Sequence, residues 1–272
     1  MRNSRATPAT SSSGHIGPLL RHWRTTRRVA QLALAVQAEV SARHLSYIES
    51  GRALPSREMI LRLADGLQIP LRERNTLLLA AGYAPLYHET DLNTAEMAEA
   101  RRAVEFILAQ QDPYPAIVLD RHWNVLMANA ATRRFMALFP ECDAPQPANS
   151  FRLIFHPRGL RPFIRNWEEL AARMIQRLQR EAAANAADKR TAALLEELLG
   201  YPGVSSRWRT PDLDRPPTPL LPICYQRDDQ VYSFFSTITT FGTPQDITLQ
   251  ELRIECFFPA DETTRTAITQ LR

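Results

Sequence analysis

The sequence has few of the features that mark exported proteins, membrane proteins and metal sites. Its three cysteines, Cys142, Cys224 and Cys256, are far apart and fit neither a CxxC redox pair nor a zinc ligand set, so we expect buried, reduced thiols. No apolar run approaches the length of a membrane span, and the first fourteen residues lack the apolar stretch of a secretory signal. We therefore expect a soluble cytoplasmic protein.

The motifs of common catalytic chemistry are missing as well. The sequence contains no GxSxG elbow, P-loop, HExxH or GxGxxG, and its acidic residues beyond residue 88 are scattered rather than paired in a recognisable motif. We expect no enzymatic activity, and nothing in the sequence calls for a cofactor or a metal ion.

The chain is long enough for two domains, and its basic charge lies in the first of them. It has 272 residues, of which 44% are hydrophobic. Residues 1–88 contain 12 arginines and no lysine against 5 acidic residues, a net +7, while the remainder contains 21 basic and 24 acidic residues, a net −3. A basic first domain indicates a nucleic-acid contact confined to that domain. An arginine-rich genome would give the same charge through ordinary solvated arginines. Sequence motifs must therefore decide between this explanation and nucleic-acid binding.

Apolar residues recur at helical spacing in five stretches between residues 15 and 85. Pro55 ends the third stretch, Ser56 caps the fourth, Pro70 opens the fifth and Gly82 closes it. We predict an all-α five-helix domain here, preceded by a disordered tail over residues 1–14. The apolar faces are Ile16, Leu20 and Trp23; Leu34 and Ala35; Leu45 and Ile48; Ile60, Leu63, Ala64 and Leu67; and Leu71, Leu77, Leu78 and Ala81.

The run SARHLSYIESGRALPSR, residues 41–57, has the pattern of a recognition helix with its closing turn. Such a helix needs two apolar positions that hold it from behind and outward side chains that reach bases and phosphates. Leu45 and Ile48 lie three residues apart and are expected to face the core. The side chains expected to project away from the core are Arg43, Ser46, Tyr47 and Ser50.

The segments GPLLRHWRTTRR and AQLALAVQAEVSARHLSYIESGRALPSREMILRLADGL together resemble the Cro/repressor-type (XRE) helix-turn-helix family over roughly residues 15 to 85. The resemblance implies that Gln31 anchors a phosphate and that Arg24 pairs with Glu49 in a structural tie between helices. Each residue by itself is as well explained by an ordinary surface or packing role; together, at the family spacing, they predict binding to the major groove of double-stranded DNA. The predicted DNA-binding residues are Gln31, Ser41, Ala42, Arg43, Ser46, Tyr47, Ser50 and Arg52, with Ala42, Arg43 and Tyr47 toward bases and Ser50 and Arg52 toward phosphates.

Two positions depart from the family pattern. Ala30 stands where a serine N-cap is usual, a loss of about 1 kcal/mol. Glu39 stands where the tight turn usually has a glycine in a left-handed conformation, which costs ~1 kcal/mol. We expect the fold to survive both.

A single domain of this kind is expected to give modest specificity. Arg43 can offer a bidentate fork to a guanine, whereas Ala42 can offer only a methyl contact to thymine. Because one module buries too little surface for operator-grade affinity, regulators of this type usually bind as dimers to half-sites about one helical turn apart. We predict a homodimer.

The second part of the chain reads as an α+β domain over residues 96–265, after a linker at 86–95 and before a C-terminal tail at 266–272. Its strands and helices predict a five-stranded antiparallel sheet with helices over one face, a layer that can enclose a pocket. The expected elements are a helix at 96–110, strands at 117–119 and 123–127, a helix from Asn129, a long helix whose stripe begins with Phe163 and Trp167, a helix at 192–199, and strands in VYSFFSTITTF and LRIECFF.

The phrases DPYPAIVLDRHWNVLMAN, HPRGLRPFIRNWEELAARM, YPGV and SFFSTITTFGTPQDITLQELRIECFFPAD resemble the ligand-binding domain of MmyB-like transcription regulators, roughly over residues 90 to 265. The first hairpin also resembles the opening of a PAS-type sensor domain. The resemblance implies a PAS-like fold that holds a small, largely apolar ligand of fatty-acid-like character.

Candidate ligand contacts are aromatic and hydroxyl side chains of the long helix and the later strand, with three polar residues that could fix a head group. An aromatic stripe at helical spacing is more often core than ligand site, so core packing remains the alternative. The candidates are Trp123, His156, Arg161, Phe163, Asn166, Trp167, Phe235, Thr237, Thr239 and Phe241.

Three functions are compatible with this sequence. The leading one is a DNA-binding transcription regulator whose second domain senses a small ligand. The second domain could instead bind a protein partner, or it could be an enzyme that the first domain localises on DNA. The operator, the ligand and the direction of regulation are not encoded in any recognisable motif.

Overall fold

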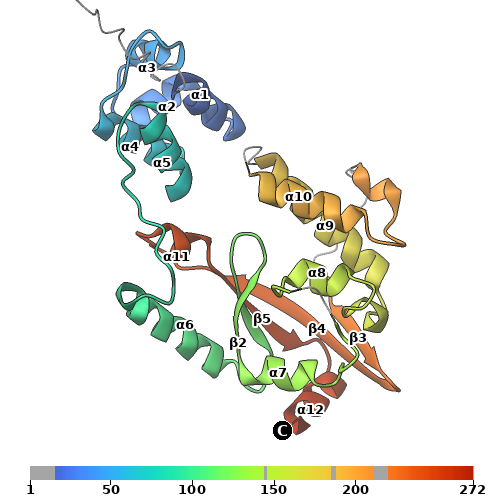
Figure 1. The fold of residues 1–272 in the computed structure, drawn as a ribbon. Coiled ribbons are helices and arrows are strands. Elements are labelled where there is room, and N and C mark those ends of the chain that lie inside the picture. Colours follow the sequence, from blue (N-terminus) through green and yellow to red (C-terminus); the bar gives the residue numbers. More distant parts are fainter. Residues whose placement is uncertain (1–15, 144–145, 185–187, 211–219, 272) are drawn as a thin grey trace, which may run out of the picture. The chain divides into compact units, whose positions relative to one another are not determined.

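The chain forms two compact units in the computed structural model, which describes residues 16–143, 146–184, 188–210 and 220–271 (Figure 1). The first unit contains the residues up to Asp91 together with Gly242–Gln250, and the second contains Leu92–Phe241 and Glu251–Arg272. The tail expected over residues 1–14 lies outside the described residues. No described helix is both long enough and apolar enough to cross a membrane.

The first unit is a bundle of helices, as its apolar spacing predicts. Its core is built from the predicted faces, with Leu34, Leu45 and Ile48 fully buried. Gly17 allows α1 to approach the end of α3, because a Cβ atom at this position would lie 2.5 Å from the carbonyl oxygen of Ile48. The helices are α1 (Ile16–Thr26), α2 (Gln31–Gln37), α3 (Ala42–Glu49), α4 (Arg57–Gly66) and α5 (Leu71–Ala80), to which the later segment adds most of α11 (Ile247–Glu251).

The second unit contains a five-stranded antiparallel sheet in the order β2-β1-β5-β4-β3. The fold class predicted from the sequence, α+β with this sheet, is confirmed. The strands are β1 (Ala116–Leu119), β2 (Val125–Ala128), β3 (Ile223–Arg227), β4 (Gln230–Thr239) and β5 (Arg253–Pro259). All four residues of β1 are buried, so the sheet is covered on both faces at this strand rather than on the one face expected.

Helices and short 3-10 turns surround this sheet (Figure 1). α9 packs against α8 and α10, and α12 packs against β4 and β5. The elements are η1 (Ala95–Met97), α6 (Ala98–Gln110), α7 (Ala130–Met136), α8 (Ser150–Phe155), η2 (Arg161–Phe163), α9 (Trp167–Ala184), α10 (Lys189–Leu199), η3 (Ser206–Arg209) and α12 (Glu262–Gln270).

The segment 266–272, expected to be a tail, contains the end of α12. Asp261 caps this helix by accepting a hydrogen bond from the Thr264 N–H at 2.7 Å. Ile268 is buried, and the Thr264 hydroxyl accepts a hydrogen bond from the backbone N–H of Ser233 on β4. These contacts hold the helix on the sheet, which explains why the expectation of a tail was wrong.

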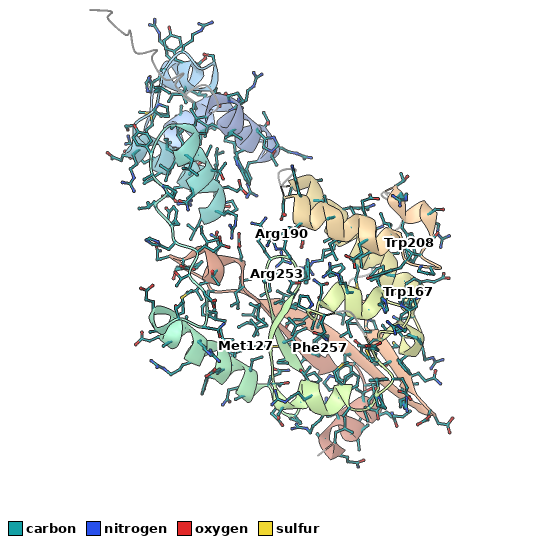
Figure 2. All side chains as sticks on the ribbon, viewed as in Figure 1. Met127, Trp167, Arg190, Trp208, Arg253 and Phe257 are labelled. Atoms are coloured by element: carbon teal, nitrogen blue, oxygen red, sulfur yellow. The ribbon has the colours of Figure 1, made fainter. Side chains whose placement is uncertain are left out.

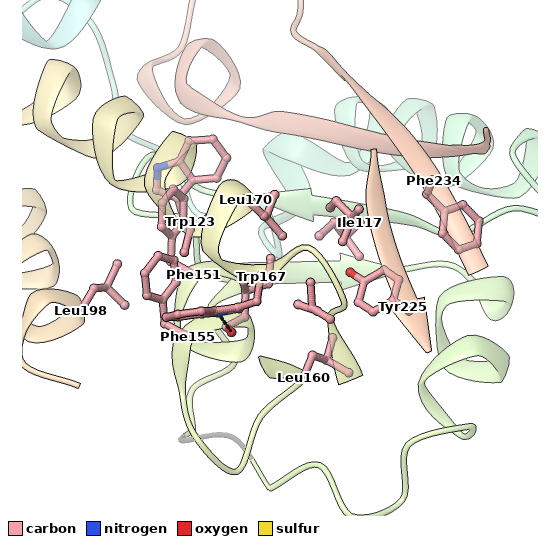
Figure 3. Close-up of a cluster of buried hydrophobic side chains, with 14 of the residues drawn as sticks. Ile117, Trp123, Phe151, Phe155, Leu160, Trp167, Leu170, Leu198, Tyr225 and Phe234 are labelled. Atoms are coloured by element: carbon pink, nitrogen blue, oxygen red, sulfur yellow. Dashed lines mark hydrogen bonds between the residues drawn. The ribbon is translucent and has the colours of Figure 1, made fainter. Parts of the chain in front are cut away.

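A cluster of aromatic and aliphatic side chains forms the core of the second unit. Trp123 and Phe151 meet edge to face with ring centroids 4.9 Å apart, and the indole N–H of Trp167 donates to the carbonyl oxygen of Ile154 at 3.2 Å (Figure 3). Phe234 of β4 belongs to the same cluster. The sheet and the surrounding helices therefore share one apolar interior.

Candidate DNA-reading surface and ligand cavity

A three-residue tie fixes α3 against α1 and α2. The Arg24 Nε and NH2 groups donate to the two carboxylate oxygens of Glu49 at 2.7 and 2.9 Å, and Gln31 Nε2 donates to Glu49 Oε2 at 3.0 Å. The side chains of Arg24 and Glu49 are only 14% and 5% exposed. The hydrogen bonds that Arg24 donates to the Glu49 carboxylate raise the pKa of the Arg24 guanidinium above its ordinary value. The orientation of α3 is thus set by charge as well as by apolar packing.

The turn that leads into α3 has the geometry of a tight helix-turn-helix connection. Glu39 has a φ of +55°, the left-handed conformation expected there, although its side chain disfavours it. Ala30 makes no side-chain cap at the start of α2. By contrast, the hydroxyl of Ser41 accepts a hydrogen bond from the His44 N–H at 3.1 Å and so caps α3.

The polar face of α3 is turned to solvent and carries a small basic cluster. Arg43 and Ser46 are exposed and Tyr47 is half-buried, while Leu45 and Ile48 on the other side are fully buried. Arg43 Nε donates to the Tyr47 hydroxyl at 3.0 Å, and its guanidinium carbon lies 5.5 Å from the Tyr47 ring centroid. Arg52, also exposed, lies 6.0 Å from the same ring. We call Arg43, Tyr47 and Arg52 the Tyr47 cluster.

Other predicted DNA-binding residues have partners inside the protein. The amide of Gln31 is held by Glu49, and the Ser50 hydroxyl donates to the carbonyl oxygen of Ser46 at 2.8 Å. Ala42 is half-buried at the start of α3. The structure therefore brings all eight predicted residues to α3 and its surroundings, with Arg43, Ser46, Tyr47 and Arg52 the most available for a second molecule.

A cavity of about 500 Å3 lies inside the second unit. Its walls are mainly apolar and come from the sheet, from α7 and α8, and from one face of α9. Among its lining residues, the charged side chains are Arg173 and Arg177 on α9 and Glu255 on β5. An apolar chamber with a few polar groups is the usual form of a small-molecule site.

Trp123 forms one wall of this cavity and is held in a strained conformation. Its φ is +69°, unusual for a bulky residue. The Asp120 carboxylate stabilises the turn by accepting hydrogen bonds from the backbone N–H groups of His122 and Asn124, at 2.8 and 2.9 Å. The indole N–H of Trp123 donates to Glu181 at 2.9 Å. The turn thus places a rigid aromatic ring at the cavity wall.

Two arginines contact the ring of Trp123. The guanidinium carbons of Arg177 and Arg253 lie 4.3 and 4.2 Å from its centroid. Both cations are paired with Glu181, Arg177 at 3.3 Å and Arg253 at 3.4 Å. Arg253 lies on β5 (Figure 2) and Arg177 lies on α9, so the two contacts connect the indole of Trp123 to the sheet and to α9.

Of the ten residues predicted to contact a ligand, Trp123 lines the cavity. Trp167 lies in the core next to Trp208, with ring centroids 5.7 Å apart (Figure 2). Arg161 lies over Trp167 at 3.8 Å and donates to the carbonyl oxygen of Pro202. Phe163 packs against Phe139, at 4.9 Å between centroids. The aromatic stripe is therefore mostly core.

Three further polar and aromatic candidates also have structural contacts elsewhere. Asn166 accepts from the Cys224 N–H at 3.1 Å and donates to the Pro222 carbonyl oxygen at 2.7 Å, so it joins α9 to β3. The ring of His156 lies edge to face with Tyr201 at 5.5 Å. Phe235 stacks on Phe258 with centroids 5.3 Å apart.

The residues predicted on β4 lie on the face opposite to the β4 residues that line the cavity. Phe235, Thr237 and Thr239 alternate on one face, and Phe241 follows the strand. The residues of β4 that line the cavity are instead Phe234 and Ser236. Side chains alternate along a strand, so a shift of one residue moves the whole set to the other face.

Sequence reasoning also missed Arg173, Arg177, Ser236 and Glu255. The helical spacing of α9 could have indicated Arg173, because Leu170, Arg173 and Met174 share the face that begins with Trp167. For Glu255, the signal is a carboxylate at the centre of the strand run LRIECFF, a position where a charged residue is unusual.

A helix-turn-helix with an exposed basic face, joined to a domain with an apolar cavity, defines a DNA-binding transcription regulator. The chain belongs to the family of MmyB-like transcription regulators. The family model for the MmyB-like transcription regulator ligand binding domain matches residues 100–271, and a helix-turn-helix domain model matches residues 15–77.

Two solved structures with a match are crystal structures of the clp gene regulator ClgR from Corynebacterium glutamicum. One is 28% identical and covers 28% of this chain and 96% of that chain, with a TM-score of 0.24. The other is 23% identical and covers 39% of this chain and 99% of that chain, also with a TM-score of 0.24. A comparison with curated proteins found no match.

Proposed function

We propose that this regulator is an XRE-type, sequence-specific DNA-binding protein that acts in the cytoplasm as a homodimer. Its PAS-like second domain holds a small, largely apolar ligand of fatty-acid-like character. The observation that carries the proposal is the exposed polar face of α3, fixed from behind by the Arg24–Glu49 ion pair, on the same chain as the cavity. Protein docking and catalysis by the second domain have no comparable support.

The Tyr47 cluster supplies the side chains for base reading. The guanidinium of Arg43 can offer two parallel hydrogen bonds to the O6 and N7 acceptors of a guanine. Its present hydrogen bond to Tyr47 is a single exposed contact, so exchanging it for a guanine costs little. Arg52 lies exposed about one turn beyond α3 and can bind a phosphate.

The segment Gly242–Gln250 supports a route from ligand to DNA. It connects β4 to β5, which supply Ser236, Glu255 and Phe257 to the cavity, yet it belongs to the DNA-binding unit. Gln250 Oε1 accepts from the Leu71 N–H at the start of α5 at 2.7 Å. A ligand that binds two arrangements of this segment unequally would change DNA affinity, typically by a coupling of about 1–3 kcal/mol.

The DNA-binding part is tested by selecting duplexes from a random pool with the full chain and then measuring equilibrium binding at fixed salt. We expect Arg43→Ala to weaken binding to the selected duplex by about tenfold or more, because a bidentate contact contributes roughly 1–3 kcal/mol. Arg102→Ala on α6 removes the same charge from an exposed position of the second unit and is the matched control. Equal affinities for the two variants would contradict the assigned surface.

The ligand-binding part is tested by extracting the purified protein with an apolar solvent and analysing the extract by mass spectrometry. We expect a co-purifying apolar small molecule. An empty cavity together with a captured polypeptide would favour protein docking instead.

A further inference from the structure

One acidic side chain, Glu255, lies among the lining residues of the apolar cavity. Its Oε1 atom accepts a hydrogen bond from the Ser236 hydroxyl at 2.7 Å. Within the described part of the chain, no arginine or lysine forms an ion pair with it, although two arginines line the same cavity. Glu255 is half-buried at the cavity wall. A carboxyl withdrawn from solvent without a salt bridge is rare, because burying an uncompensated charge is costly.

The charged groups around Glu255 are mostly engaged with one another. Arg177 and Arg253 share Glu181, and their guanidiniums lie over Trp123. The other titratable groups nearby are Arg173 on α9, Tyr225 on β3, Cys256 on β5 and Asp120 in the turn between β1 and β2. Glu255 thus faces the cavity as a hydrogen-bonding group rather than as half of an ion pair.

Burial raises the pKa of the Glu255 carboxyl above its ordinary value. The hydrogen bond from Ser236 and the positive charges of Arg177 and Arg253 act in the opposite direction but do not cancel it. The neutral form of a carboxyl has an O–H donor that the ionised form lacks. In its neutral form, Glu255 can donate to an acceptor atom on a ligand in the cavity.

We propose that Glu255 holds the ligand by donating a hydrogen bond to a carbonyl oxygen, so that the cavity selects apolar molecules with an ester, lactone, ketone or carboxyl group. This inference rests on the proposed ligand-binding function of the cavity. Ser236 donates to one oxygen of Glu255 and thereby orients the carboxyl. A purely hydrocarbon ligand would leave the O–H donor of Glu255 without an acceptor. The lost hydrogen bond would weaken binding of such a ligand and so make the cavity selective for carbonyl compounds.

The experiment measures displacement of Nile red from the full chain by methyl decanoate, which has a carbonyl oxygen, and by decane, which has none. Titrations run between about pH 5 and pH 9, a range wide enough for a buried carboxyl to ionise. The variants are Glu255→Gln, whose amide donates at every pH, and Glu262→Gln, a matched change on the exposed start of α12.

For the native chain and Glu262→Gln, we expect the affinity for methyl decanoate to fall by roughly fivefold to tenfold as the pH rises. We expect no such fall for Glu255→Gln, or for decane with any variant. Retained binding of methyl decanoate without pH dependence, or the same dependence in Glu255→Gln, would overturn the role of Glu255. Failure of Nile red and both compounds to bind at any pH would contradict the proposed ligand-binding function itself.

Discussion

Glu49 ties α3 to the two helices that precede it. It accepts hydrogen bonds from Arg24 and Gln31 while only 5% exposed. Removing it leaves the half-buried Arg24 guanidinium without its counter-charge. Removing one partner of such an ion pair destabilises the fold by more than the intact pair stabilises it, because the remaining charge is left without a partner.

We predict that Glu49→Ala lowers the free energy of opening of α3 by roughly 2–4 kcal/mol. The measurement is amide hydrogen exchange of the α3 residues. Glu105→Ala removes an exposed (i, i+4) partner of Arg101 and is expected to change stability by less than about 0.5 kcal/mol. Unchanged exchange in α3 would show that apolar packing alone holds this helix.

Glu255 predicts a pH dependence of stability that needs no ligand. Its folded-state pKa lies above the unfolded value, so the contribution of its neutral form is fully present below the unfolded pKa and is lost as the pH rises through the folded pKa. We expect the urea midpoint of the second unit to fall with rising pH in this window for the native chain, and to fall less in Glu255→Gln. Parallel curves for the two proteins would contradict this.

The helices of the first unit could be predicted from sequence because each has one buried face and a clear boundary signal. Leu45 and Ile48, or Leu63 and Ala64, recur at a spacing that only a helix places on one side. The left-handed turn at Glu39 could be anticipated from the family pattern, not from glutamate itself.

The strands of the second unit were found, but the faces of β4 could not be assigned. Aromatic and β-branched residues occupy both faces of this strand, since Phe234 faces the core and Phe235 stacks on Phe258. Without an apolar and polar alternation there is no local signal for the cavity side. The short α12 was missed because Ile268 is its single large buried side chain.

Helix α5 is capped by Gln250, a residue too far away in the sequence to be predicted as its cap. Pro70 precedes the helix and has no side-chain donor or acceptor, and the Leu71 N–H donates to Gln250 instead. Asp246 in the same segment accepts from the hydroxyl of Thr90 at 2.7 Å. The start of α5 therefore depends on a segment between two cavity strands.

We predict that Gln250→Ala increases amide exchange of Leu71 by about fivefold to tenfold, as expected for loss of a helix cap. Gln226→Ala on β3, whose amide donates to the carbonyl oxygen of the nearby Asp228, is the matched control. Equal exchange of Leu71 in both variants would show that Gln250 does not stabilise α5. It would also remove the support for a route through this segment.

The chain combines a helix-turn-helix domain with a larger ligand-binding domain, and we predict that two copies bind DNA together. One recognition helix offers few base contacts, so two copies are needed for operator-grade affinity. We predict that a duplex with two half-sites about one helical turn apart binds at least about a hundredfold more tightly than a single half-site. Sedimentation of the complex should show two chains per duplex; one chain with equal affinity for both duplexes would contradict the dimer.

The most direct test of the account is a double-mutant cycle between Arg43 and each base pair of the selected operator. Binding is measured for the native chain and for Arg43→Ala with every single base-pair replacement. We predict one G·C pair per half-site whose replacement costs the native chain roughly 1–3 kcal/mol and costs Arg43→Ala nearly nothing. Additive losses at every base pair would contradict a direct contact between the exposed face of α3 and the major groove.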